Sequence, residues 1–270
     1  MRYRLLRLTK LSARLFVVLY SAAWISMGAS DLPRNEAAAA PVLVELFTSE
    51  GCSSCPPADR LLQELDRSQP VSGAQLIVLS EHVDYWNHIG WTDPFSSRFF
   101  SDRQSAYSDR FGLGSVYTPQ MVVDGTTEFV GSDSRLANQA CEKARRAEKI
   151  PVRVSAVFLE SPSTLRTHVE TDPLPESSKA RKADIYVVVA LNHAESQVLR
   201  GENEGHRLTH VAVVQSLTKV GSSEKGKSFV QDVRVKLDPG TDPANLRVIV
   251  FVQESGPGPV LGAALQRVTK

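Results

Sequence analysis

The stretch that decides the fold is Val44–Asp59, VELFTSEGCSSCPPAD. It continues an apolar run at 41–47 (PVLVELF), which predicts a buried strand. Cys52 and Cys55 follow on a turn rich in small residues, and the next segment, 57–67, carries leucines at helical spacing. The sequence therefore predicts a strand, a Cys-x-x-Cys turn and a helix in immediate succession.

The residues that follow continue the alternation of strands and helices. We expect strands at 75–80, 120–123 and 126–130, a hairpin turn at Asp124-Gly125, and helices at 95–111 and 132–149. Residues 41–150 thus read βαβαββα. A parallel pair joined by helical crossovers, then an antiparallel hairpin and a closing helix, is the arrangement of thioredoxin. We predict an α/β, thioredoxin-like domain here.

Pro151 ends the last of these helices, and a different pattern begins. Six segments read as strands separated by Pro, Gly, Ser and Asp clusters: 152–160, 164–172, 183–192, 207–220, 228–238 and 246–253. No strong helical pattern appears among them. We therefore predict a β-rich, sandwich-like C-terminal domain over 151–270, or an elaboration packed on the first domain.

Residues 1–40 have the layout of a secretory signal. Basic residues at 2–14 precede an apolar run at 15–27 (LFVVLYSAAWISM), and small residues follow. The run is shorter than the roughly 20 residues that span a bilayer. We expect a signal peptide cleaved between Ala29 and Ala40, and a periplasmic or secreted protein with no later membrane span. An uncleaved N-terminal anchor is the alternative.

Composition excludes several classes of protein. Hydrophobic residues make up 42% and charged residues 23% of the chain, which is typical of a globular protein. Three cysteines are too few for a scaffold held together by disulfides. The net charge is +1, and its basic excess lies in residues 1–40, so no nucleic-acid partner is indicated. No cofactor is expected.

The Cys-x-x-Cys turn carries the strongest chemical signal. Two cysteines three apart can form a disulfide, and a thiolate beside a helix N-terminus is stabilised by N–H groups and the helix dipole. This indicates thiol redox chemistry at Cys52 and Cys55. A structural disulfide is one alternative. A metal site is another, but with only Cys141 remaining, a four-cysteine zinc site is impossible and the ligands would be Cys52, Cys55 and His82.

Three further side chains are candidates because of their place along the predicted strands. Glu45 lies in an otherwise apolar strand, where a buried carboxylate would pass a proton to a thiol, or where it would simply face solvent at an edge. His82 and Asp84 follow the second strand at its carboxyl end, the edge at which Cys52 also lies. His82 would serve as proton carrier or metal ligand, or as a structural histidine.

The run VELFTSEGCSSC resembles the strand-to-cysteine segment of glutaredoxins. One difference is that Pro56 and Pro57 follow the second cysteine at once, and proline is favoured at the first helical position. The helix therefore begins at Pro56, with Cys55 at the cap. We take Cys52 as the nucleophile, because Gly51 leaves the approach to it open.

Four motifs together, VELFTSEGCSSCPPAD, HVDYWNHIGW-DPF, VYTPQMVVDG and GENEGHRLTH, resemble a family of bacterial exported thioredoxin-like proteins, domain of unknown function 1223. The resemblance implies a thioredoxin-like domain with a β-rich part, and no assigned reaction. The likeness to thioredoxin-like proteins implies a cis peptide bond at Thr118–Pro119, facing the cysteines and docking the substrate chain; the residues by themselves would favour a trans proline at a strand start. Glu202 and Asn203 lie in a loop that reads as a plain hairpin turn, with approach to the same pocket as the alternative.

The leading hypothesis is an exported thiol–disulfide oxidoreductase acting on protein or small-molecule disulfides. Cys52 attacks, Cys55 resolves, and Thr118–Pro119 docks the substrate. Two alternatives stay open: a periplasmic metal-binding module, with copper as the expected metal, and a non-catalytic binding protein in which Cys52–Cys55 is a structural disulfide. The sequence does not distinguish reductase, oxidase and isomerase.

Overall fold

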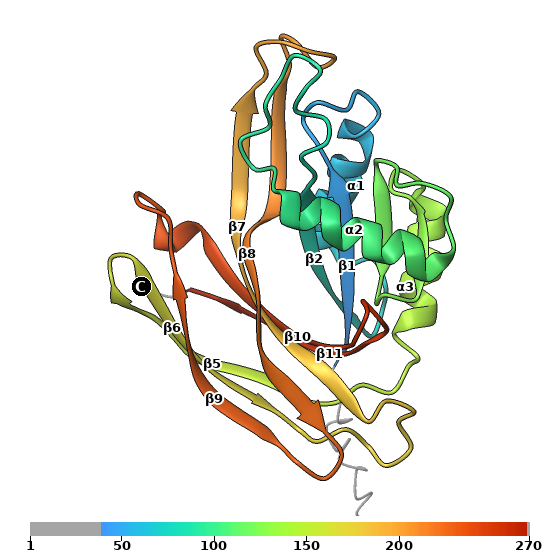
Figure 1. Ribbon diagram of the computed structural model, residues 1–270, viewed down its shortest axis with the longest axis vertical. Helices are drawn as coiled ribbons and strands as arrows, with labels where there is room; N and C mark the ends of the chain where they lie inside the picture. The colour runs from blue at the N-terminus through green and yellow to red at the C-terminus, as the bar shows by residue number, and fades with distance from the viewer. Residues whose placement is uncertain (1–38, 269–270) are drawn as a thin grey trace, which may run out of the picture. The chain divides into compact units, whose positions relative to one another are not determined.

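The computed structural model describes residues 39–268. The predicted leader, apart from its last two residues, lies outside this range. The described chain is a mixed α/β structure dominated by strands (Figure 1). None of its helices is long and apolar enough to cross a membrane.

The N-terminal part contains the strands and helices in the predicted order. They are β1 (Ala40–Thr48), α1 (Pro56–Ser68), β2 (Ala74–His82), α2 (Arg98–Phe111), β3 (Gln120–Val123), β4 (Thr127–Val130) and α3 (Ser134–Ala144). Local sequence explains the helix ends. α1 starts at the two prolines, and the side chain of Asp133 caps α3 by accepting a hydrogen bond from the main-chain N–H of Leu136.

The C-terminal part contains the six predicted strands and one more. They are β5 (Val152–Ser161), β6 (Thr164–Thr171), β7 (Lys182–Gln197), β8 (Arg207–Glu224), β9 (Phe229–Lys236), β10 (Leu246–Glu254) and β11 (Val260–Arg267), with a short 3-10 turn η1 (Pro243–Asn245) before β10. The sequence did not predict β11, because its centre, Gly262-Ala263-Ala264, has low strand propensity. Gly262 is required there, since a Cβ would lie 2.3 Å from the carbonyl oxygen of Ile150.

One large sheet runs through both parts of the chain. Its strand order is β11-β10-β7-β8-β2-β1-β3-β4, and a separate three-stranded sheet has the order β5-β6-β9. β1 and β2 are parallel, β3 is antiparallel to β1, and β8 joins the outer edge of β2. The expected sandwich-like arrangement differs from this. β5, β6 and β9 do pack on β7 and β10 through a shared apolar core, but β7, β8, β10 and β11 extend the N-terminal sheet.

The physical reason for this extension is the exposed edge that β2 would otherwise present. An unpaired strand edge carries free N–H and C=O groups, and proteins cover such edges or pair them. The hairpin of β7 and β8 is long enough to pair with β10 along one part and to reach the edge of β2 along another. Residues far apart in the sequence therefore share one sheet.

Helices cover both faces of the sheet around β1. Leu46 of β1 packs against Leu62 of α1 in one core cluster, which α3 also covers. Phe47, the next residue, points to the opposite face and packs against Tyr107 of α2. This follows from the alternation of side chains along a strand. Because both faces are covered, β1 reads as a continuous apolar run rather than an alternating one.

Candidate functional site

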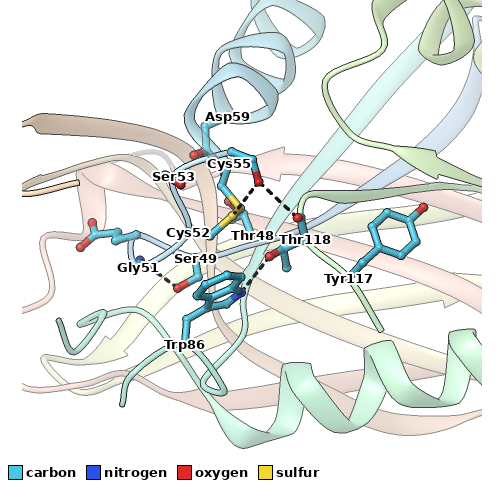
Figure 2. The surroundings of a disulfide bond; sticks show 12 residues. Thr48, Ser49, Gly51, Cys52, Ser53, Cys55, Asp59, Trp86, Tyr117 and Thr118 are labelled. Atoms are coloured by element: carbon cyan, nitrogen blue, oxygen red, sulfur yellow. Dashed lines mark hydrogen bonds between the residues drawn. A yellow bond between two sulfur atoms is a disulfide. The ribbon is translucent and has the colours of Figure 1, made fainter. Parts of the chain in front are cut away.

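The CSSC turn joins the end of β1 to the start of α1. The helix begins at Pro56 with Cys55 as its N-cap, as predicted. Cys52 and Cys55 are joined by a disulfide with Cα atoms 5.4 Å apart, a usual separation for such bonds. Figure 2 shows this pair. The hydroxyl of Ser54 lies 3.3 Å from the Cys52 sulfur.

Neither cysteine is accessible to solvent, since both are 0% exposed. The expectation that Gly51 leaves the approach to Cys52 open is therefore wrong for this conformation. Gly51 is itself buried, and a Cβ there would lie 3.1 Å from the Cβ of Trp86. The glycine allows Trp86 to pack against the turn, and the substrate path that we expected is occupied.

The segment Thr118–Pro119 lies against the same turn. Its peptide bond is cis, as the resemblance implied. The indole N–H of Trp86 donates a hydrogen bond to the Thr118 hydroxyl at 2.8 Å (Figure 2). The Ser54 hydroxyl donates to the Thr118 carbonyl at 3.5 Å. The first three sequence motifs are thus brought together at one end of the sheet.

The loop between β7 and β8, residues 198–206, reaches this site as well; we call it the hairpin tip. The Glu202 carboxylate accepts hydrogen bonds from the Ser53 main-chain N–H at 3.0 Å and the Ser53 hydroxyl at 2.6 Å. The Asn203 amide donates to the carbonyl oxygens of Glu50 at 2.8 Å and Cys52 at 3.0 Å. The sequence favoured a plain turn here, and the structure shows a turn whose side chains hold the CSSC loop.

A group of buried titratable side chains lies on the α1 face of the sheet at this end. We call it the buried polar cluster; its members, each at most 5% exposed, are Glu50, Asp59, His82, Asp93 and His210. Asp59 also appears near Cys55 in Figure 2. The Thr48 hydroxyl donates a hydrogen bond to Asp59 at 2.9 Å. Of the five, only His82 was predicted as a site residue.

The contacts within the cluster link its members. His82 Nδ1 lies 2.7 Å from Asp93 Oδ2, and His210 Nε2 lies 3.3 Å from Glu50 Oε1. His210 Nδ1 lies 3.7 Å from Asp59 Oδ1. The rings of His82 and His210 meet edge to face with centroids 4.7 Å apart. These contacts make the cluster one connected group near the CSSC turn, with Asp59 contributed by α1 and His210 by β8.

The carboxylates determine the charge of this cluster. Burial lowers the pKa of His210, but the nearby carboxylates of Asp59 and Glu50, of which Glu50 is hydrogen-bonded to the ring, outweigh burial and raise the pKa to about 10. Burial raises the pKa of Asp93, while the charge and hydrogen bond of His82 lower it more, so that the net shift is downward. His82 Nε2 has no hydrogen-bond partner among the described residues. The two carboxylates therefore favour the protonated, cationic form of His210.

Two predicted site residues lie elsewhere. Glu45 faces α2, on the face of the sheet opposite α1, and forms a buried ion pair with Arg103 while Tyr107 donates a hydrogen bond to it. The pleat of β1 is the reason, because Glu45 shares its face with Phe47 and not with Leu46. Asp84 also turns away from the cysteines and accepts a 2.5 Å hydrogen bond from the Ser101 hydroxyl of α2.

The alternative set of metal ligands is not assembled in this structure. Cys52 and Cys55 are bonded to each other, and His82 Nδ1 faces Asp93. Within residues 39–268, no group of three or more His, Cys, Asp or Glu side chains is arranged to hold a metal ion.

Residues 43–253 match the family model described as "Protein of unknown function (DUF1223)". The chain belongs to this family. A crystal structure of a protein from Agrobacterium tumefaciens is 25% identical, with a TM-score of 0.66 over 85% of this chain and 95% of that one. HBP35 of Porphyromonas gingivalis is 15% identical, with a TM-score of 0.63 over 86% of this chain and 76% of that one, a likeness of fold alone. No curated protein matches the chain.

Sequence reasoning missed four members of the buried polar cluster, and the only sign of them in the sequence is their place in the quoted motifs. Glu50, Asp59, Asp93 and His210 all lie inside the four motifs that resemble the family, yet nothing in their spacing marks them as neighbours. Sequence separation explains this, since Glu50 and His210 are in contact across 160 positions.

Proposed function

We propose that this protein is an exported thiol–disulfide oxidoreductase acting on protein or small-molecule disulfides. The observation that carries the proposal is a disulfide-bonded Cys-x-x-Cys at a strand-to-helix turn, with the Thr118–Pro119 segment against it. The two cysteines of such a pair are three residues apart, so their sulfurs can join and separate within the turn itself.

A thioredoxin-like fold for residues 40–144 is part of this proposal. The strand order β2-β1-β3-β4, with β1 parallel to β2 and antiparallel to β3, supports it. So does the placement of α1 and α3 on one face and α2 on the other. In this interpretation, the remaining strands are an extension of the sheet at the free edge of β2.

The proposed reaction is thiol–disulfide exchange. The Cys52 thiolate attacks one sulfur of a substrate disulfide, and the other substrate sulfur leaves as a thiolate. The Cys55 thiolate then attacks the Cys52 sulfur of the mixed disulfide and releases the second substrate thiolate. Two electrons pass to the substrate, and the product is the Cys52–Cys55 disulfide of the structure. An external dithiol restores the reduced pair by the same steps in reverse.

The described conformation is closed to this exchange, because both cysteines are fully buried. The covering groups are the hairpin tip on one side and Trp86 with Thr118 on another. We propose that a substrate displaces one of them. Zero exposure also favours a second candidate, a non-catalytic protein in which Cys52–Cys55 is a structural disulfide.

One titration separates these candidates. The purified protein is equilibrated with a glutathione redox series, its free thiols are alkylated, and the product is read by intact mass. An exchange catalyst has a midpoint between about −120 and −270 mV, whereas a structural bond resists reduction below about −300 mV. The latter result would refute the proposed function.

A turnover assay provides the second test. Reduction of insulin disulfides by dithiothreitol is followed with wild type, Cys52→Ser and Cys141→Ser. Cys141 is a buried free thiol on α3, so its substitution is the matched control. We expect Cys52→Ser to abolish the acceleration and Cys141→Ser to retain it. An unchanged rate in Cys52→Ser would also contradict the proposal.

A further inference from the structure

The hairpin tip places a negative charge one residue from Cys52. The carboxylate of Glu202 is exposed and accepts hydrogen bonds from both the hydroxyl and the main-chain N–H of Ser53. These two bonds, that of the hydroxyl first, lower the pKa of Glu202. The carboxylate is therefore ionised at neutral pH.

The position of this charge is set by buried contacts of the same loop. Asn203 is 6% exposed and donates to two carbonyl oxygens of the CSSC loop. Gly201, with φ +82°, packs against the loop that follows β2, where a Cβ would lie 3.3 Å from the Cβ of Trp91. The tip is thus held at both Asn203 and Gly201, and Glu202 lies between them. Figure 1 shows the β7–β8 turn and the β1–α1 turn at the same end of the molecule's sheet.

A thiolate at Cys52 would need the opposite environment. Main-chain N–H groups at a helix N-terminus stabilise a cysteine thiolate, and a nearby anion destabilises it. Glu202 occupies the Ser53 N–H and holds its negative charge against the residue that follows Cys52. Glu50, Asp59, Asp93 and His210 are also titratable groups near the turn; all four are buried, and within residues 39–268 none forms a hydrogen bond or ion pair with Glu202.

We propose that Glu202 is a positioning residue for the thiol chemistry of this site, which disfavours negative charge on the Cys52 sulfur and favours the disulfide over the reduced pair. The inference rests on the proposed function and deepens it. The reaction concerned is the reduction of one Cys52–Cys55 bond by two glutathione molecules, which yields two protein thiols and one glutathione disulfide. Two electrons move from glutathione to the protein.

The test compares Glu202→Gln with Glu204→Gln. Glutamine retains an oxygen that accepts from Ser53 and removes only the charge. Glu204 is an exposed acid in the same turn that makes no side-chain hydrogen bond within residues 39–268, so it is the matched control. The variants are made in a Cys55→Ser background, and the absorbance of the Cys52 thiolate at 240 nm is titrated against pH. The signal of the protein that carries both Cys52→Ser and Cys55→Ser is subtracted.

We expect Glu202→Gln to increase the acid dissociation constant of Cys52 by about fivefold, the order of effect expected from removing one nearby unit charge that solvent partly screens. The increase should shrink in 1 M salt, because exposed charges are screened. Glu204→Gln should stay within about twofold of wild type. In the protein that retains both Cys52 and Cys55, the equilibrium constant for reduction by glutathione at pH 9 should rise by a similar factor. This corresponds to a change of about 20 mV in the reduction potential.

Equal dissociation constants in the two variants would overturn the inference, and so would a shift that salt does not reduce. This failure is distinguishable from failure of the proposed function. If turnover depends on Cys52 but Glu202→Gln has no effect, only the role of Glu202 is wrong. If turnover is absent while the dissociation constant still shifts, Glu202 tunes the thiol of a non-catalytic disulfide.

Discussion

His210 is a cation enclosed by two buried carboxylates, and replacing it with glutamine tests this arrangement. Its pKa is raised from 6.5 to about 10, because Asp59 and Glu50 outweigh the effect of burial. The folded state therefore binds the proton more tightly than the unfolded state does. The resulting stability is fully present below pH 6.5 and is lost as the pH rises through 10.

The size of the effect follows from the shift. A change of 3.5 pKa units corresponds to about 5 kcal/mol at most. Because folding is linked to proton binding at His210, the free energy of unfolding should fall by about 2.5 kcal/mol between pH 7 and pH 9. In His210→Gln this decrease should disappear, and the protein at pH 7 should be less stable by about 3–5 kcal/mol, since two carboxylates lose their buried cation.

Urea unfolding at pH 7 and pH 9, followed by far-ultraviolet circular dichroism, measures this. His193→Gln is the control, because His193 is an exposed histidine whose side chain pairs with Glu195 at the surface. Nuclear magnetic resonance titration of the wild-type imidazole gives a readout that does not require the variant to fold. If wild type and His210→Gln lose the same stability between the two pH values, or if the imidazole titrates near 6.5, His210 is not the cation described here.

Two further predictions concern packing and reactivity. Gly131→Ala should destabilise the fold by about 1–3 kcal/mol, because the new Cβ would lie 2.7 Å from the Cδ1 of buried Leu46. Gly114→Ala is the control and should be nearly neutral, since open space surrounds Gly114. Thermal unfolding of both variants measures the difference. Burial raises the pKa of the Cys141 thiol to about 12, so iodoacetamide should label it only after unfolding, and labelling of the native protein within minutes would contradict this.

The local structure around the cysteines could be predicted because its signals are local. The start of α1 at Pro56 follows from the absent N–H of proline, which is tolerated in the first turn of a helix. β11 was missed because Gly262 and its alanine neighbours have weak strand propensity, and pairing with β10 decides their conformation.

The side chains of the site were harder to predict. Both faces of β1 are buried, so its apolar run does not say which face a given residue occupies. Glu45 was therefore a reasonable candidate for the cysteines' face, although the pleat directs it to Arg103. Asp84 lies at the expected edge of the sheet, but the Ser101 hydroxyl provides its partner.

The sequence by itself determined the order of strands and helices in the first half of the chain, the CSSC turn between β1 and α1, and most of the strands that follow. These depend on periodicity, proline and turn residues within about ten positions. Only the tertiary structure decided that the β7–β8 hairpin joins β2, that Glu202 and Asn203 hold the CSSC loop, and that His210 lies between Glu50 and Asp59. These contacts join residues about 150 positions apart, and they form because burying a shared sheet edge and pairing buried charges are properties of the assembled fold.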